Sequence, residues 1–449
     1  MRLSRRNFVM AGAALAGGAA LAAPVSAAHA APRKRWEDTY SGGTLDVEPG
    51  EPGLPGQHYT PVVVPNGAAL PFKVVDGVKV FHLVAEEVDH EFADGLKARC
   101  WGYNGRVNST LIEAVEGERV RIYVTNKLPA PTTVHWHGLY LPNGMDGVSG
   151  LTQAPIPPGE TFKYEWTLRQ HGTYMYHSHH DSMTQEAMGL IGMFVIHPRN
   201  PGEDDRVDRD FALMLSEWRI DPGTYRPNPN EMTDFNVLTI NGRCFPGTDA
   251  LVAALNQRVR IRIGNLSAMD HHPIHLHGYR FKITATDGER IPVEAQWPET
   301  TVLVAVGQTR EVELIADAPG DWAMHCHMSH HVMNQMGHEI PNVIGMDTEQ
   351  LDGPVRSMLP GYMTMGQNGM DDHLKHIEMG HMQMPENSIP MVGRPGPFSY
   401  IDMGGMFTVF KVREGLASFD DPGWYRHPDG TVAKVASAGE LTRDGVKIA

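Results

Sequence analysis

The chain carries the same pattern of short apolar segments twice, about 140 residues apart. In the first copy, GERVRIYVTN precedes HWHG and PGETFKYEW precedes GTYMYHSH, all between residues 117 and 179. In the second copy, QRVRIRIGN precedes HLHG and GQTREVELI precedes GDWAMHCH, between residues 257 and 327. Short segments that alternate apolar and polar residues between turn signals are typical of antiparallel β-sandwiches. The repeat therefore predicts one β-sandwich unit that occurs twice.

Composition agrees with two turn-rich β domains and excludes some classes of function. The chain has 449 residues with 47 glycines and 33 prolines, which favours turns over long helices. The formal net charge of −15 argues against a nucleic-acid partner. No segment after the first 30 residues is apolar over a spanning length, so we expect no stable membrane insertion.

The first 30 residues predict an export signal that is not part of the fold. They contain the adjacent arginines Arg5 and Arg6, an apolar run rich in Ala and Gly, and a small-x-small site at residues 28–30. SRRNFVM resembles a bacterial twin-arginine signal, which indicates export to the periplasm or the medium. A weak membrane anchor is the alternative, but glycines interrupt the apolar run. Residues 31–71 are rich in Pro and Gly, and we expect them to form an arm over the surface.

Four His-x-His pairs fall at matching positions in the two repeats. With 24 histidines in 449 residues, chance alone would give about 1.3 such pairs. In a strand, residues i and i+2 point to the same face, so each pair presents two imidazoles side by side. Exposed strand histidines would explain a single pair but not four in register, and eight imidazoles suit copper, zinc or iron. The pairs are His135/His137, His177/His179, His275/His277 and His325/His327.

The cysteine in HCHMSHHVMNQM decides among these metals. Strand alternation places Cys326 on the face opposite to His325 and His327, so we expect two metal sites back to back. A lone thiolate with two histidines and a long axial methionine is the ligand set of a blue-copper electron-transfer site. A structural zinc site would need neither the methionine nor eight further histidines. The nearby candidates for the other three ligands are His272, His331 and Met336.

The motifs TVHWHG, YHSHH, HHPIHLHG and HCHMSHHVMNQM resemble the four copper-binding motifs of the multicopper oxidases, and the resemblance covers about residues 72–348. It implies an all-β chain with two cupredoxin-like Greek-key β-sandwich domains, at residues 72–202 and 203–348. A Met/His-rich extension at 349–449 follows them. The implied activity couples one-electron oxidation of a donor to the four-electron reduction of O₂ to water. Phenols, aromatic amines and metal ions such as Cu(I) are the expected donors.

The resemblance also implies four copper ions per functional unit. The type 2 copper would be bound by His135 and His275. The type 3 pair would be bound by His137, His177, His179, His277, His325 and His327. The type 1 copper would be bound by His272, Cys326, His331 and Met336. Electrons are expected to enter near the exposed edge of His272 or His331, and to cross Cys326 to the two histidines beside it.

Within the family, the motifs resemble those of the two-domain (small) laccases. The interval between HWHG and HPIHLHG leaves no room for an additional domain. The first repeat has HSH where the second has HCH, so Ser178 replaces the thiolate and the first domain is expected to hold no type 1 copper. In that group the trinuclear site lies between the first domain of one subunit and the second domain of the next, which implies a homotrimer.

Two positions bear on proton supply. Asp146, nine residues after His137, matches the acid beside the trinuclear cluster in the family, and the alternative interpretation is an ordinary turn aspartate. Several relatives place a carboxylate directly after the second type 1 histidine. This chain has Val332 there, so the sequence does not identify the proton route.

Two other functions stay open. A copper nitrite reductase also uses two cupredoxin domains in a trimer, but it would carry the thiolate motif in the first domain and lack the paired type 3 histidines. A non-catalytic copper-sequestering protein would not require a trinuclear arrangement. Between Met358 and Met406 lie ten of the 25 methionines and three histidines. These either bind Cu(I) as soft ligands or serve as packing.

Several residues near the motifs are expected to have no role in these copper sites. Histidines adjacent to ligands point away from them by alternation, and the neighbouring methionines are expected to pack. Two cysteines outside the motifs form either a disulfide or two free buried thiols. The GGMFTVFKV segment is expected to add an edge strand. The residues concerned are His180, His271, His330, Met324, Met328, Met333, Cys100 and Cys244.

Overall fold

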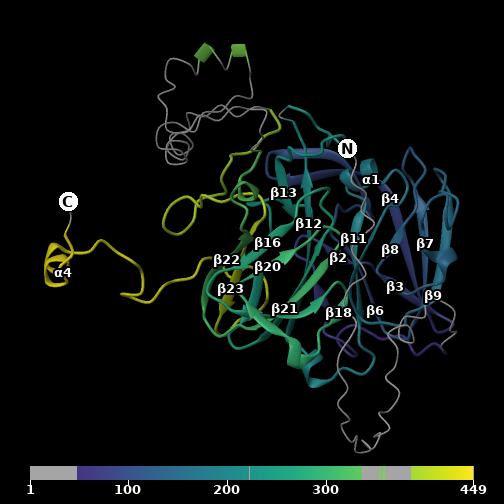
Figure 1. Cartoon of the computed structure of the whole chain (residues 1–449), viewed down its shortest axis with the longest axis horizontal. Coiled ribbons are helices and arrows are strands. Elements are labelled where there is room, and N and C mark those ends of the chain that lie inside the picture. The colour runs from purple at the N-terminus through teal and green to yellow at the C-terminus, as the bar shows by residue number, and fades with distance from the viewer. Residues whose placement is uncertain (1–47, 222, 336–352, 355–356, 359–385, 448–449) are drawn as a thin grey trace, which may run out of the picture. The chain divides into compact units, whose positions relative to one another are not determined.

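The computed structural model describes residues 48–221, 223–335, 353–354, 357–358 and 386–447, and all of these belong to one compact unit, 42–449. Strands dominate the described part, with short helices such as α1 (Ser182–Ala187) and α4 (Ala438–Arg443) (Figure 1). Three predictions lie wholly or largely outside the described residues: the export signal, the ligand Met336, and most of the methionine-rich tail.

The first domain contains two five-stranded sheets. In one, the order is β3 (Phe72–Val75), β4 (Val78–Ala93), β7 (Arg119–Asn126) and β9 (Thr161–Thr167), with β5 (Leu96–Tyr103) paired to β4. In the other, the order is β2 (Ala68–Ala69), β6 (Thr110–Val115), β11 (Ile191–His197), β10 (Gly172–His177) and β8 (His135–His137). The second sheet matters for function because β8 and β10 carry histidine pairs.

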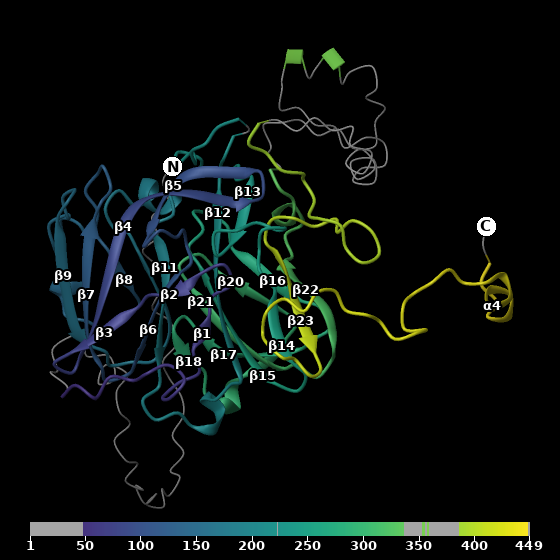
Figure 2. The ribbon, with the colours of Figure 1, turned by 180° about the vertical axis from the view of Figure 1, so that it is seen from behind.

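The second domain also contains two sheets. The larger has the order β1 (Val62–Val63), β12 (Arg209–Trp218), β15 (Arg258–Asn265), β21 (Thr309–Ile315), β17 (Phe281–Thr286) and β18 (Glu289–Arg290). In addition, β13 (Val237–Ile240) pairs with β12, and β19 (Trp297–Glu299) pairs with β17. The smaller has the order β14 (Leu251–Ala254), β23 (Phe407–Arg413), β22 (Gly320–Cys326), β16 (His272–Leu276) and β20 (Thr301–Val304) (Figure 2).

These four sheets pack as successive layers, with a hydrophobic core between each pair. One core fills the first domain between the β4 and β10 sheets, and another fills the second domain between the β12 and β22 sheets. A smaller core joins the domains, and strand alternation explains how. Phe211 and Leu213 of β12 face the core of the second domain, whereas Ala212 and Met214 face the core between domains. The β22 sheet is therefore separated from the first domain by the β12 sheet.

A buried ion-pair network also joins the domains. Arg262 of β15 forms two 2.8 Å hydrogen bonds with the carboxylate of Asp210 and one of 2.6 Å with Glu311. Its Nη1 also donates to Oγ1 of Thr173 in the first domain at 2.7 Å, and that hydroxyl donates to Glu311. Pairing offsets part of the cost of burying these charges, and the bond to Thr173 links the two domains.

The expected antiparallel sandwiches are in fact mixed sheets. The pairs β4–β7, β6–β11, β12–β15 and β14–β23 run parallel, and most of the others run antiparallel. Parallel neighbours arise because the chain crosses to the opposite sheet between them and returns in the same direction.

Two other expectations were wrong. GGMFTVFKV forms β23, which lies between β14 and β22 and is therefore an interior strand, not an added edge. The arm does not simply lie over the surface, because Val62 and Val63 pair with β12 and Ala68 and Ala69 pair with β6. The segment before the first domain thus adds a strand to a sheet of each domain.

The two cysteines outside the motifs are free buried thiols, so the disulfide alternative is excluded in this structure. Cys100 and Cys244 both belong to one small core formed by residues around β5 and the end of β12. Burial raises the pKa of the Cys244 thiol to about 12. No helix in the described ranges is long and apolar enough to cross a membrane.

Candidate metal centres

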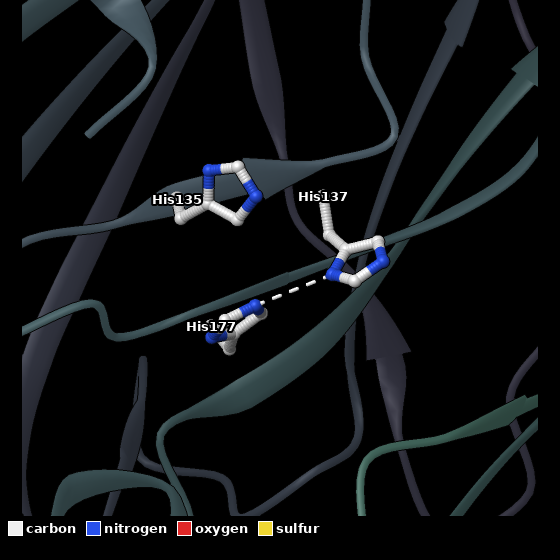
Figure 3. Close-up of side chains that lie close together, drawn as sticks. All are labelled: His135, His137 and His177. Carbon is white, nitrogen blue, oxygen red and sulfur yellow. Dashed lines mark hydrogen bonds between the residues drawn. The ribbon is translucent and has the colours of Figure 1, made fainter. Parts of the chain in front are cut away.

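The first histidine quartet lies at one edge of the first domain, where β8 ends its sheet. His135 and His137 lie on β8, His177 ends the neighbouring strand β10, and His179 follows two residues later. Ring centroids of five of the six pairs within the quartet are 5.3–6.1 Å apart. Nδ1 of His137 and Nε2 of His177 are 3.4 Å apart (Figure 3). His135, His137 and His177 each offer one nitrogen within 4.8 Å of the others, which suits a metal ion.

Outer hydrogen bonds orient two of these rings. His135 donates from Nδ1 to the main-chain oxygen of Asp146 at 2.8 Å, and the Asp146 carboxylate lies 3.3 Å from the same nitrogen. His177 donates from Nδ1 to the carbonyl of Ser178 at 2.9 Å and to Oε1 of Glu186 at 3.1 Å. Each ring therefore keeps Nε2 free as a ligand atom, which is the usual arrangement of a metal-binding histidine.

Burial lowers the pKa of His135 and His137, which keeps both rings neutral and able to bind a metal. His177 behaves differently. Burial lowers its pKa, but the hydrogen bond and negative charge of Glu186 more than compensate, so the pKa of His177 is raised overall. Glu186 was missed by sequence reasoning, because a lone glutamate in a short helix carries no motif.

The second quartet repeats this arrangement on the outermost sheet of the second domain. His275 lies on β16 and His325 on β22, with His277 and His327 just beyond the ends of these strands. Ring centroids of five of its six pairs are 4.8–5.8 Å apart, and Nε2 of His277 lies 3.1 Å from Nε2 of His325. His325 donates from Nδ1 to the carbonyl of Cys326 at 2.9 Å, as His177 does to Ser178.

Cys326 lies on the opposite face of β22, as alternation predicted, and a second set of donor atoms meets there. Sγ of Cys326 is 3.5 Å from Nδ1 of His331 and 3.8 Å from Nδ1 of His272. The two imidazole nitrogens are 3.1 Å apart, so all three atoms can share one ion. One thiolate sulfur and two imidazole nitrogens fit copper. The fourth predicted ligand, Met336, lies outside the described residues.

The sequence predicted an exposed ring edge at His272 or His331, and this prediction is wrong. His272 is 0% exposed and His331 is 8% exposed. Nε2 of His272 makes a 2.6 Å hydrogen bond with Oγ of Ser267, and Nε2 of His331 lies 3.5 Å from the Asp270 carboxylate. Burial, with a further contribution from His331, lowers the pKa of His272 to about 3. Burial raises the pKa of Cys326 to about 12.

The equivalent place in the first domain is filled by hydrogen-bonded polar groups. Thr132 precedes His135 by three residues, as His272 precedes His275, and Ser178 occupies the position of the cysteine. The Ser178 hydroxyl donates to Oε1 of Gln185 at 2.6 Å, and the Thr132 hydroxyl donates to the same atom at 2.7 Å. Hydroxyl and amide groups take the place of a soft thiolate here, which disfavours a blue-copper site.

The two quartets do not meet within the chain. The described residues include all eight histidines, and no ring contact or hydrogen bond links one quartet to the other. Their sheets explain this, since β8 belongs to the first domain and β16 and β22 lie on the far side of the β12 sheet. Each chain therefore presents two separate histidine quartets.

The residues expected to lie outside the copper sites are placed as follows. His271 and His330 are exposed, and His180 bonds to Ser149 at 2.9 Å. Met324 is buried in the core of the second domain, which agrees with a packing role. Met328 is 40% exposed, so the expectation that it packs is wrong.

Two family models, each described as multicopper oxidase, match residues 84–201 and 221–344. Together they cover more than half of the chain. The chain belongs to the multicopper oxidase family.

Curated relatives include enzymes and copper-resistance proteins. Copper resistance protein A from Pseudomonas syringae pv. tomato is 28% identical over 267 residues, which cover 49% of this chain and 43% of that protein. Oxidoreductase OpS5 from Beauveria bassiana is 32% identical over 252 residues, 51% of this chain and 41% of that protein. Laccase-1 from Cryptococcus neoformans var. grubii is 29% identical over 227 residues, 44% of this chain and 36% of that protein. The chain thus covers less than half the length of these relatives.

Solved structures support the fold. A blue copper oxidase from Nitrosomonas europaea aligns with a TM-score of 0.54 at 26% identity, covering 74% of this chain and 85% of that one. The multicopper oxidase mgLAC aligns with a TM-score of 0.56 at 26% identity, covering 79% and 91%. The predicted all-β, cupredoxin-like fold is confirmed.

Proposed function

We propose that the chain is a laccase-like oxidase that couples one-electron oxidation of a donor to reduction of O₂ to water. The observation that carries this proposal is the placement of Cys326 between His325 and His327 on one strand end. One face of β22 offers the donor set of an electron-accepting copper, and the other face offers half of a histidine cluster. Bound copper, four ions per functional unit, would supply one-electron chemistry at Cys326 and O₂ chemistry at the histidines.

Residues of the chain itself would connect the Cys326 site to the histidine cluster and would supply protons. The backbone bonds between Cys326 and its two neighbours, with the His325 to Cys326 carbonyl hydrogen bond, form the short link between them. Val332 is buried and has no carboxylate to offer. Asp146 lies beside the first quartet and is partly exposed, so its carboxylate is the proposed proton donor near His135.

We further propose that the cluster forms between subunits, with the first domain (72–202) of one chain facing the second domain (203–348) of the next. The separation of the quartets within one chain supports this arrangement, since a half-site of four histidines needs a partner to hold three metal ions. A closed ring of three chains would satisfy every half-site through identical contacts. We also propose export to the periplasm or medium by the twin-arginine route, on the basis of residues 1–30.

A complementation experiment tests the site between subunits. H135A/H137A removes the first half-site, and H275A/H277A removes the second. Each double variant alone should be inactive in O₂ reduction. When both are co-expressed in equal amounts, about a quarter of the interfaces should pair two intact half-sites, so about a quarter of wild-type activity should return. No recovery, with mixed trimers present, would contradict the proposal.

The activity itself is tested on the copper-loaded protein. O₂ uptake should be followed with a phenol, with Cu(I) and with nitrite in turn. The proposal predicts a blue protein that consumes O₂ with a phenol or Cu(I). A blue protein that consumes O₂ with neither donor would favour the sequestering alternative, and reduction of nitrite without O₂ uptake would favour a nitrite reductase.

A further inference from the structure

A cavity of about 440 Å³ is lined by residues from both sheets of the second domain, and none of them is a predicted copper ligand. This volume is in the range of small-molecule sites. Most of the lining side chains are apolar, and three of them are phenylalanines. Such walls suit a ligand with an apolar body and a few polar groups. The charged residues of the lining are Arg209, Arg394, Lys411, Asp249, Asp420 and Asp421.

Aromatic rings stack against the two arginines of this cavity. The guanidinium carbon of Arg209 lies 3.9 Å from the ring centre of Phe419. That of Arg394 lies 5.7 Å from the ring centre of Phe245 and 5.3 Å from that of Trp424. A guanidinium group that stacks on a ring through its flat face can still donate hydrogen bonds from its edge. The rings thus hold both arginines without using their N–H groups.

The N–H groups of these arginines have few partners in the protein. Nε of Arg209 donates to the carbonyl of Val252 at 3.1 Å. Nε of Arg394 is buried and has no hydrogen-bond partner among the described residues. Neither arginine forms an ion pair with a carboxylate in the described ranges. A buried donor without a partner is costly, and a carboxylate matches the edge of a guanidinium group with its two oxygens.

The three aspartates of the lining are exposed to solvent and bonded elsewhere. Asp421 pairs with Nζ of Lys411 at 2.5 Å. Asp249 accepts a backbone N–H at 2.9 Å, and Asp420 accepts a serine hydroxyl at 2.9 Å. The cavity as a whole is therefore not strongly cationic. An anion would be selected by the two guanidinium edges and not by a general positive field.

One wall of the cavity is fixed by contacts with β23. The ring centre of Phe245 lies 4.6 Å from that of Phe407, in an edge-to-face arrangement. The Thr248 hydroxyl donates to the carbonyl of Phe407 at 2.8 Å, and the Thr408 hydroxyl donates to the carbonyl of Asp249 at 2.8 Å. A wall that is already held in place does not have to be ordered when a ligand binds, which favours affinity.

We propose that this cavity binds an aromatic carboxylate. Its carboxylate group accepts hydrogen bonds from the guanidinium edges of Arg209 and Arg394, and its ring packs against Phe245 and Val409. The cavity shares no lining residue with the predicted copper sites. The inference is therefore independent of the proposed oxidase function.

Benzoate is the binding probe, because it has no phenolic hydroxyl to be oxidised. It should be titrated by calorimetry into the copper-loaded full chain and into R394Q, in which glutamine removes the charge but keeps a polar side chain. We expect the affinity for benzoate to fall about 10- to 100-fold in R394Q, as for the loss of a charged hydrogen bond. The blue absorption should stay at its wild-type value. R443Q removes an exposed arginine outside the cavity and should bind benzoate as the wild type does.

Two further probes test the chemical class of the ligand. Benzamide has the shape of benzoate without its charge, and it should bind the wild type at least about tenfold more weakly. Equal binding of benzamide overturns the assignment of an anion, and equal binding of inorganic phosphate overturns the assignment of an aromatic ligand. A wild type that does not bind benzoate, an unchanged affinity in R394Q, or an equal loss in R443Q also overturns the proposal. If circular dichroism shows that R394Q does not fold, R209Q decides by the same measurement.

Discussion

Nδ1 of His177 donates to Oε1 of Glu186 at 3.1 Å, which leaves Nε2 to face His137. The negative charge of Glu186 is what raises the pKa of His177 against the effect of burial. In copper-free E186Q, His177 should therefore titrate at a lower pH than in the wild type, as measured by NMR. Loss of this orienting carboxylate should also weaken copper retention at the quartet about 10- to 100-fold, measured by dialysis against a chelator.

A control for E186Q is present in the same molecule. His171 pairs with Glu116 at 3.2 Å, and that pairing raises the pKa of His171. The pKa of His171 should be the same in E186Q as in the wild type. An unchanged pKa of His177 would show that Glu186 does not stabilise its charged form.

Ser267 should tune the copper site at Cys326. With Nδ1 of His272 directed at the thiol and its partner histidine, Nε2 carries the proton and donates to Ser267 Oγ at 2.6 Å. This hydrogen bond makes the imidazole a better ligand for Cu(II) than for Cu(I). S267A should therefore raise the reduction potential by about 40 mV, for a bond worth about 1 kcal/mol. Redox titration of the blue absorption measures the shift, and a potential that falls would contradict the assigned direction of the bond.

Copper binding at Cys326 should depend steeply on pH. Burial raises the pKa of the thiol to about 12, so it is protonated at neutral pH and must lose its proton to bind a metal. His272, with a pKa of about 3, is already neutral and releases none. The copper affinity of the metal-free protein should thus rise about tenfold per pH unit between about pH 7 and 9. Competition with a chelator, read by the blue absorption, tests this. A pH-independent affinity would mean that the thiol is already ionised.

The Arg262 network should stabilise the contact between domains. R262A removes the closest partner of the buried carboxylates of Asp210 and Glu311 and leaves them only the 3.6 Å pairs with Arg260. It should therefore lower the free energy of unfolding by about 3–5 kcal/mol. T173V removes hydroxyl hydrogen bonds but leaves the ion pairs intact, so about 2 kcal/mol is expected. Urea unfolding followed by fluorescence compares the two. Equal losses in both variants would show that the charge pairing adds little.

The sequence predicted the local geometry of the sites but not the residues that contact the ligands from outside the motifs. It placed His325 and His327 opposite Cys326, because the side chains of a strand alternate between faces. It did not find Glu186 or Ser267, since neither lies in a motif and both act only through contacts made by folding. It also placed GGMFTVFKV at an edge, whereas β23 lies inside a sheet, because strand order is not encoded in the pattern of a single segment.

The sequence by itself determined the repeated β-sandwich, the donor atoms and their division between two kinds of site. Spacing along a strand is a local property, so it can be read from the residues directly. The tertiary structure alone decided that His135 and His275 belong to separate quartets, and that Arg262 of the second domain bonds to Thr173 of the first. These relationships join segments far apart in the chain, and they depend on how the sheets pack as layers.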